Sequence, residues 1–76
     1  MQSISQEDKL YYSHRTDTYW VAKYAESGKY KVPMFEVHRL HRFGSDPLYK
    51  VWPGDEGMVI RHLDYGAKLM ERIKIL

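Results

Sequence analysis

The most regular hydrophobic pattern lies in the last third of the chain, over residues 55–74. At about 100° per residue, apolar side chains fall on one side of a helix and charged side chains on the other. The pattern predicts one amphipathic helix whose apolar stripe is buried. The stripe contains Val59, Leu63, Gly66, Met70 and Ile73, and the opposite face contains Arg61, Asp64, Lys68, Glu71 and Arg72.

A second interpretation of this region stays open. Residues 53–57 could form a hairpin loop, followed by a fourth strand over 58–63 and a short helix from Asp64. The triplet that begins at Met58 is locally typical of a strand. We favour the long helix because its stripe has a single 3.6-residue period from Val59 onward.

The middle of the chain has the alternation that is typical of strands. Residues 17–26 and 29–42 are rich in tyrosine, valine and tryptophan, and Gly28 lies between them, which predicts a β-hairpin. A loop at 43–47 then leads to a short third strand at 48–52, where Pro53 and Gly54 follow. We therefore expect a three-stranded antiparallel sheet.

The start of the chain is more polar. Residues 1–15 are expected to be irregular or to contain a short helix over 6–12, since Ser5 and the acid three residues later resemble a capping box. The fold class predicted from these elements is α+β. It is a small two-layer domain with the sheet at 17–52 packed by the helix at 55–74.

Composition limits the size of the core and its environment. The 76 residues predict a single domain over 1–76 with a thin core, and the absence of cysteine removes disulfides and suits a cytoplasmic protein. The net charge of +2 is too small to argue for nucleic acid by itself. No apolar run approaches the roughly 20 residues that span a bilayer, so we expect no membrane association.

The sequence offers no metal or cofactor site. His38 and His41 lie three residues apart in a predicted strand, where they would point to opposite faces and could not share a metal ion. His14 and His62 lie elsewhere in the chain. We expect neither a metal nor a cofactor.

Candidate catalytic residues are equally sparse. The serines all lie in predicted termini or turns, and the Ser13–His14 neighbours say nothing about the geometry of a triad. The acids look like turn and cap residues and show no paired acid–base arrangement. The sequence therefore favours a protein that is not an enzyme.

One basic and aromatic cluster is a candidate contact surface. Seven tyrosines and two tryptophans are many for 76 residues, and binding surfaces are enriched in both. Charged strand ends also serve solubility and block edge pairing, so the cluster has a structural explanation as well. The candidate contact residues are Tyr30, Lys31, His38, Arg39, His41 and Arg42.

These observations favour a small, non-enzymatic protein-binding module. It would act by occupying a partner's surface, as small accessory proteins and inhibitors of the phage type do. The alternative is a nucleic-acid-binding domain that uses the basic, aromatic sheet face, because such faces can contact phosphates and stack bases. A homodimer also stays open.

Overall fold

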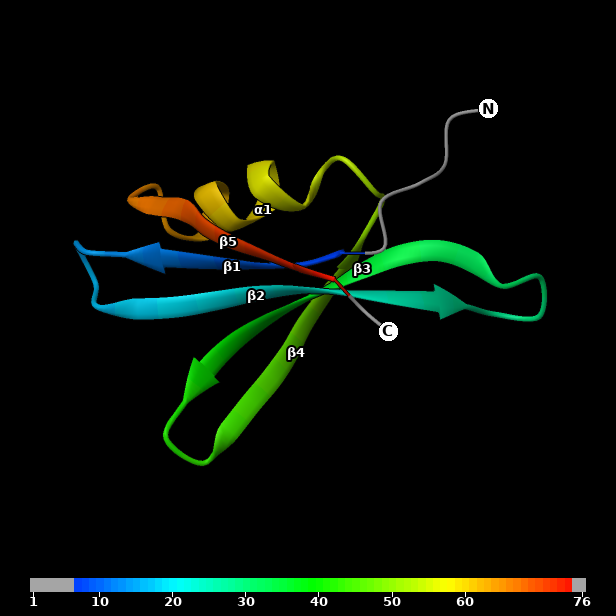
Figure 1. Ribbon diagram of the computed structural model, residues 1–76, viewed down its shortest axis with the longest axis horizontal. Helices are drawn as coiled ribbons and strands as arrows, with labels where there is room; N and C mark the ends of the chain where they lie inside the picture. Colours follow the sequence, from blue (N-terminus) through cyan, green and yellow to red (C-terminus); the bar gives the residue numbers. More distant parts are fainter. Residues whose placement is uncertain (1–6, 75–76) are drawn as a thin grey trace.

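The computed structural model describes residues 7–74, with side chains up to residue 70. Five strands form one antiparallel sheet in the order β4-β3-β2-β1-β5, and one short helix joins β4 to β5 (Figure 1). The elements are β1 (Glu7–Ser13), β2 (Thr18–Ser27), β3 (Val32–His41), β4 (Gly44–Val51), α1 (Glu56–Leu63) and β5 (Ala67–Lys74).

The central hairpin was predicted correctly. β2 and β3 pair from Trp20↔Arg39 to Ser27↔Val32, and Gly28 has a positive φ of 79° in the turn between them. Glycine adopts this conformation without the steric cost of a Cβ atom. Pro33 is accommodated near the start of β3, opposite Glu26.

The predicted three-stranded sheet is wrong, because the sheet has five strands. The first error lies at the start of the chain, where the described part of 6–12 belongs to β1 and is not helical. β1 pairs with β2 from Lys9↔Ala22 to Ser13↔Thr18, so alternate residues are buried against the sheet's inner face. The segment resembles a capped helix in its local sequence, but pairing with β2 across a tight connection makes it a strand.

The predicted long helix at 55–74 is also wrong. α1 ends at Leu63, and Ala67–Lys74 forms β5, which pairs with β1. Met70, assigned to the buried stripe, is 60% exposed on β5. The alternative interpretation is wrong as well, since 58–63 is helical and the strand comes after it. Pairing with the edge of β1 gives the backbone N–H and C=O groups of residues 67–74 hydrogen-bond partners. This pairing outweighs the helical periodicity of the side chains.

The predicted third strand is longer than expected. β4 begins at Gly44 and includes most of the predicted loop at 43–47. Its pairing with β3 shifts register between Val37 and His38, which leaves Leu48 as an extra residue between partners Pro47 and Tyr49. A bulge of this kind bends a strand, and the β3–β4 hairpin turns away from β1 and β2 (Figure 1).

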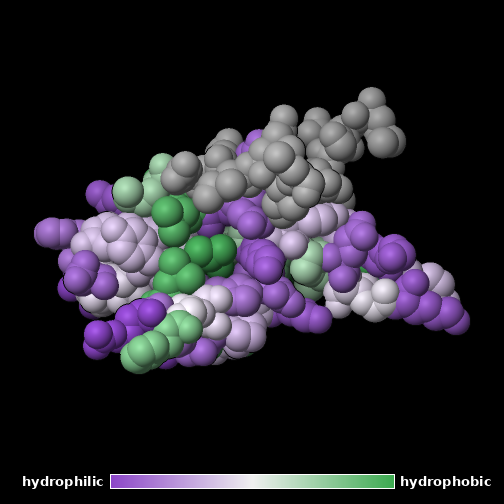
Figure 2. Space-filling model, turned by 60° about the horizontal axis from the view of Figure 1, so that its bottom comes forward, coloured by the Kyte–Doolittle hydropathy of each residue, from purple (hydrophilic) through white to green (hydrophobic). Residues whose placement is uncertain are grey.

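The core lies between α1 and the inner face of the sheet. Phe35, Val37 and Ala22 are almost fully buried on neighbouring strands, and Ile60 is the apolar residue of α1 that reaches them. Tyr11, Trp20 and Ala67 complete this cluster of buried apolar residues. The side that faces away from α1 has a small apolar patch among hydrophilic residues (Figure 2).

Candidate functional site

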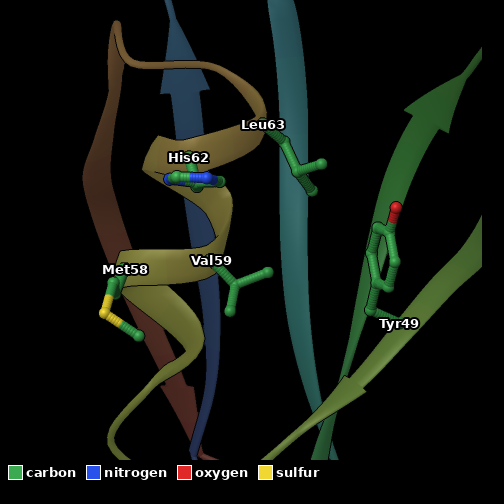
Figure 3. A pocket seen from close by; sticks show the side chains of 5 residues that line it. All are labelled: Tyr49, Met58, Val59, His62 and Leu63. Carbon is green, nitrogen blue, oxygen red and sulfur yellow. The ribbon is translucent and has the colours of Figure 1, made fainter.

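The candidate site is a groove between α1 and β4. It has a volume of about 420 Å³ and is lined by Tyr49, Met58, Val59, His62 and Leu63. Val59 and Leu63 project from α1 toward Tyr49, whereas His62 lies over the middle of the helix and Met58 extends from the side away from Tyr49 (Figure 3). Apolar side chains therefore form both walls, and the His62 imidazole is the polar group among them.

The groove exists because α1 and the bent end of the sheet diverge. α1 presents Ile60, which is fully buried, to the core, and this leaves Val59 and Leu63 on its side. Tyr49 shares the inner sheet face with Val37, its partner on β3. The bend of the β3–β4 hairpin keeps Tyr49 from closing onto the helix, so it remains 53% exposed.

The groove walls carry unusually exposed apolar side chains. Met58 is 59% exposed and Leu63 is 39% exposed, although both belong to the only helix in the described part of the chain. Trp52, on the connection from β4 to α1, is 61% exposed. Exposed apolar residues around a hollow, as Met58 and Leu63 are here, are typical of interaction sites.

A buried carboxylate holds the end of α1 beside this groove. Asp64 is 2% exposed and accepts hydrogen bonds from Ser13 Oγ at 2.8 Å, Arg15 Nη2 at 3.0 Å and Trp20 Nε1 at 3.2 Å, and also from Thr16 Oγ1. Burial alone would raise the pKa of Asp64. The hydrogen bonds from Thr16, Ser13, Trp20 and Arg15 outweigh burial and lower this pKa to about 2.

A second carboxylate holds the start of α1. Glu56 is 3% exposed, forms an ion pair with Lys9 on β1 and accepts the Gly54 backbone N–H at 2.7 Å. Burial opposes ionisation of Glu56, but the Lys9 ammonium and the backbone hydrogen bonds lower its pKa. Both ends of α1 are thus fixed to the β1–β2 part of the sheet.

The structure does not bring the six predicted contact residues together. Tyr30 and Lys31 lie in the β2–β3 turn, and His41 and Arg42 lie at the β3–β4 turn. Ten residues of β3 separate these turns, a distance of roughly 30 Å at about 3.3 Å per residue. The two turns resemble each other, since Lys29 lies over the Tyr30 ring and Arg42 over the Phe43 ring.

His38 and Arg39 lie on opposite faces of β3. His38 is buried, with Nδ1 3.1 Å from Ser45 Oγ and Nε2 3.2 Å from Glu36 Oε1. We interpret this histidine as a bridge between β3 and β4, since both ring nitrogens face polar side chains of these strands. Arg39 is exposed on the inner face, opposite Trp20.

The hydrophobic pattern did not predict the groove, because it places Val59 and Leu63 on the buried stripe. In the structure, the buried residues of α1 are Glu56 and Ile60. The helix is therefore rotated about its axis relative to the predicted helix, whose buried stripe contained Val59 and Leu63. A signal was present in Asp64, Tyr65 and Gly66. Aspartate and glycine are frequent in turns, so this segment favours the end of a helix. It could have been used to predict that the helix ends at Leu63.

Neither a metal site nor a spanning helix is found in the described residues. Within 7–74, no group of three or more His, Asp or Glu side chains is arranged to hold a metal ion. No helix in this range is long and apolar enough to cross a membrane. Comparison with protein-family models, with curated proteins and with solved structures found no match.

Proposed function

We propose that this chain is a small non-enzymatic protein-binding module and that the groove between α1 and β4 is its contact surface. The observation that carries the proposal is the apolar lining of this 420 Å³ hollow, with Met58 and Tyr49 more than half exposed at its walls. Burying such side chains against a partner is favourable at about 25 cal/mol per Å².

The shape of the groove favours a protein ligand. Its walls are a helix side and a tyrosine on a strand, and the hollow between them has a volume of about 420 Å³. Binding energy in protein interfaces is concentrated where anchor side chains enter a pocket. An extended or helical segment that presents a leucine, methionine or aromatic residue would fit this requirement.

We also propose a cellular location for the protein and a way in which it acts on its partner. A chain without cysteine is suited to the cytoplasm. The protein would act by covering a partner's surface, as small inhibitors do. The basic turn at Arg42 and Phe43 could add contacts at the rim of an interface, because Phe43 is 85% exposed.

Peptide selection on the purified protein tests the contact surface. Peptides selected from a random display library should contain apolar anchors and should lose at least about tenfold in affinity, or 1.4 kcal/mol, for Met58→Glu. Met70→Glu is the matched control, because Met70 is 60% exposed and Met58 is 59% exposed. Selected peptides that bind both variants as well as the wild type would show that the groove is not the contact surface.

A titration with labelled duplex DNA, duplex RNA and single strands covers the nucleic-acid alternative. The protein-binding proposal predicts no tight binding by fluorescence anisotropy at either low or moderate salt. Sub-micromolar binding that weakens steeply between about 50 and 200 mM salt would be the counterion-release signature of phosphate contacts. That result would replace the proposal with a nucleic-acid-binding function.

A further inference from the structure

Two tyrosine rings lie in contact on the sheet face that is opposite α1. Tyr12 of β1 is paired with Tyr19 of β2, and their ring centroids are 4.7 Å apart at an interplanar angle of 44°. Their neighbours in the chain, Tyr11 and Trp20, are buried in the core, so the alternation of a strand places Tyr12 and Tyr19 on the outer face. The sheet therefore separates this pair from the groove.

The hydroxyl group of Tyr12 is bound to a proton acceptor. It donates a hydrogen bond of 2.7 Å to Asp17 Oδ1, and Asp17 is exposed in the turn between β1 and β2. This hydrogen bond is the main cause that raises the pKa of Tyr12, so the phenol stays protonated at neutral pH. Loss of an electron makes the hydroxyl of a phenol strongly acidic, and the Asp17 carboxylate lies where the released proton is received.

The arrangement of the two rings suits the formation of a carbon–carbon bond between them. Two directly bonded phenyl rings have centroids only slightly closer than those of Tyr12 and Tyr19, and such rings are also twisted relative to each other. Coupling therefore requires the rings to turn rather than to travel. The backbone holds directly opposite side chains close together, and groups held in contact react far faster than groups that must meet by diffusion.

We propose that Tyr12 and Tyr19 form an oxidative coupling site, at which a one-electron oxidant joins their rings into a dityrosine that links β1 to β2. Each phenol gives up one electron and one proton, and the proton of Tyr12 passes to Asp17. The two phenoxyl radicals form a bond between ring carbons next to the oxygens. The hydrogens on those carbons then move to the oxygens and restore both phenols. A haem peroxidase supplied with hydrogen peroxide takes up the two electrons and two protons and releases two molecules of water.

Exposure alone would favour other tyrosines for oxidation. Tyr30 is 81% exposed and Tyr65 is 75% exposed, compared with 44% for Tyr19. The groups that lie over these two rings are cations, Lys29 over Tyr30 and Arg15 over Tyr65. Contact between two phenol rings, and not exposure, decides which pair couples within one molecule, so Tyr30 and Tyr65 serve as controls.

Oxidation of the purified full chain with a haem peroxidase and hydrogen peroxide tests the site. At low protein concentration the product should keep the size of the monomer, weigh less by two hydrogen atoms and show the blue fluorescence of dityrosine. After digestion with trypsin, mass spectrometry should find the peptide 10–15 joined to the peptide 16–23. The linked protein should melt at a higher temperature than the untreated protein, because the link restricts the unfolded chain.

Phenylalanine variants identify the rings that couple. Tyr12→Phe and Tyr19→Phe should each abolish the cross-link within the monomer, because phenylalanine keeps the ring but forms no phenoxyl radical. Tyr30→Phe and Tyr65→Phe should leave its yield unchanged. Asp17→Asn should slow the reaction severalfold without changing the peptides that are joined, since an amide is a much weaker proton acceptor than a carboxylate.

The peptides mapped in the wild-type protein decide the outcome without any variant. A protein that forms no dityrosine, or forms it only between molecules, overturns the proposal. A cross-link within the monomer that joins other tyrosines also overturns it, as does one that persists in Tyr12→Phe or Tyr19→Phe. Oxidation in urea separates the strands and should lose the selectivity. The same selectivity in urea would mean that closeness along the chain, and not the fold, brings the rings together.

Discussion

The two sides of α1 meet the rest of the chain in different ways. The side toward β1 and β2 is fixed by polar groups, with Glu56 bound by Lys9 at one end and Asp64 bound by four donors at the other. The side toward β4 offers apolar side chains to a hollow that nothing in the described residues fills. The helix is therefore held by electrostatics on one side and left available for contact on the other.

The contrast between the two sides shows how a small chain can keep an apolar surface exposed. Carboxylates buried at both ends of the helix set its position through directional hydrogen bonds, and breaking those bonds would leave buried polar groups unpaired. Under the proposed function, the residues that stabilise the helix differ from those that would contact a partner.

Removing the Asp64 carboxylate should have the largest effect. Asp64→Ala leaves the Trp20 indole N–H and the Ser13 hydroxyl buried without an acceptor, so we expect a loss of about 3–5 kcal/mol, enough to unfold a domain of this size. Thermal melts followed by circular dichroism measure this loss. Asp55→Ala, which removes an exposed carboxylate that makes no capping hydrogen bond, should cost under about 0.5 kcal/mol. Equal melting temperatures for the two variants would contradict the distinction between the sides of α1.

The second largest effect should come from the ion pair at the start of α1. Lys9→Met leaves the Glu56 carboxylate buried with only backbone donors, and we expect a loss of about 2–3 kcal/mol in urea unfolding. The double variant Lys9→Met/Glu56→Gln should recover part of this loss, because the uncompensated charge is gone. Additive losses in the double-mutant cycle would show that the two side chains act independently.

Acid should weaken the fixed side of α1 with a smaller effect. The folded pKa of Asp64 is about 2 and lies below its ordinary value of 3.8, so its stabilisation is complete above pH 3.8 and is lost as the pH falls through about 2. The pKa of Glu56 is also lowered and acts in the same direction. Urea unfolding at a series of acidic pH values should show this decline. Unchanged stability between pH 4 and pH 2 would mean that neither carboxylate is held ionised by the fold.

The smallest effect on stability should come from the groove side. Met58→Glu places a charge on a side chain that is already 59% exposed, so we expect a change within about 0.5 kcal/mol in the free energy of unfolding. The same variant should lose peptide binding. A loss of several kcal/mol in the monomer would show that Met58 belongs to the core, and the contrast between the two sides of α1 would disappear.

Local sequence signals were reliable for the β2–β3 hairpin, but they failed for β1, although β1 also pairs with its neighbour in the chain. The β2–β3 hairpin was predicted because two aromatic, β-branched runs are joined through Gly28, and its pairing needs no distant residue. The candidate contact residues were found as a sequence cluster, yet Tyr30 and Arg42 lie at opposite ends of β3. A strand extends 3.3 Å per residue, so residues close in sequence are not thereby close in space.

The amino-acid pattern alone was enough to predict an α+β chain with a central hairpin, a thin core and no disulfide. That Ala67–Lys74 is a strand depends on long-range pairing, because its partner β1 lies more than fifty residues earlier in the chain. The same holds for the rotation of α1 about its axis, which determines the residues that face the core. Lys9 and the donors around Asp64, which lie far from α1 in the chain, set this rotation. Periodicity reports which side chains share a face of one element, whereas long-range hydrogen bonds decide which element forms and what that face meets.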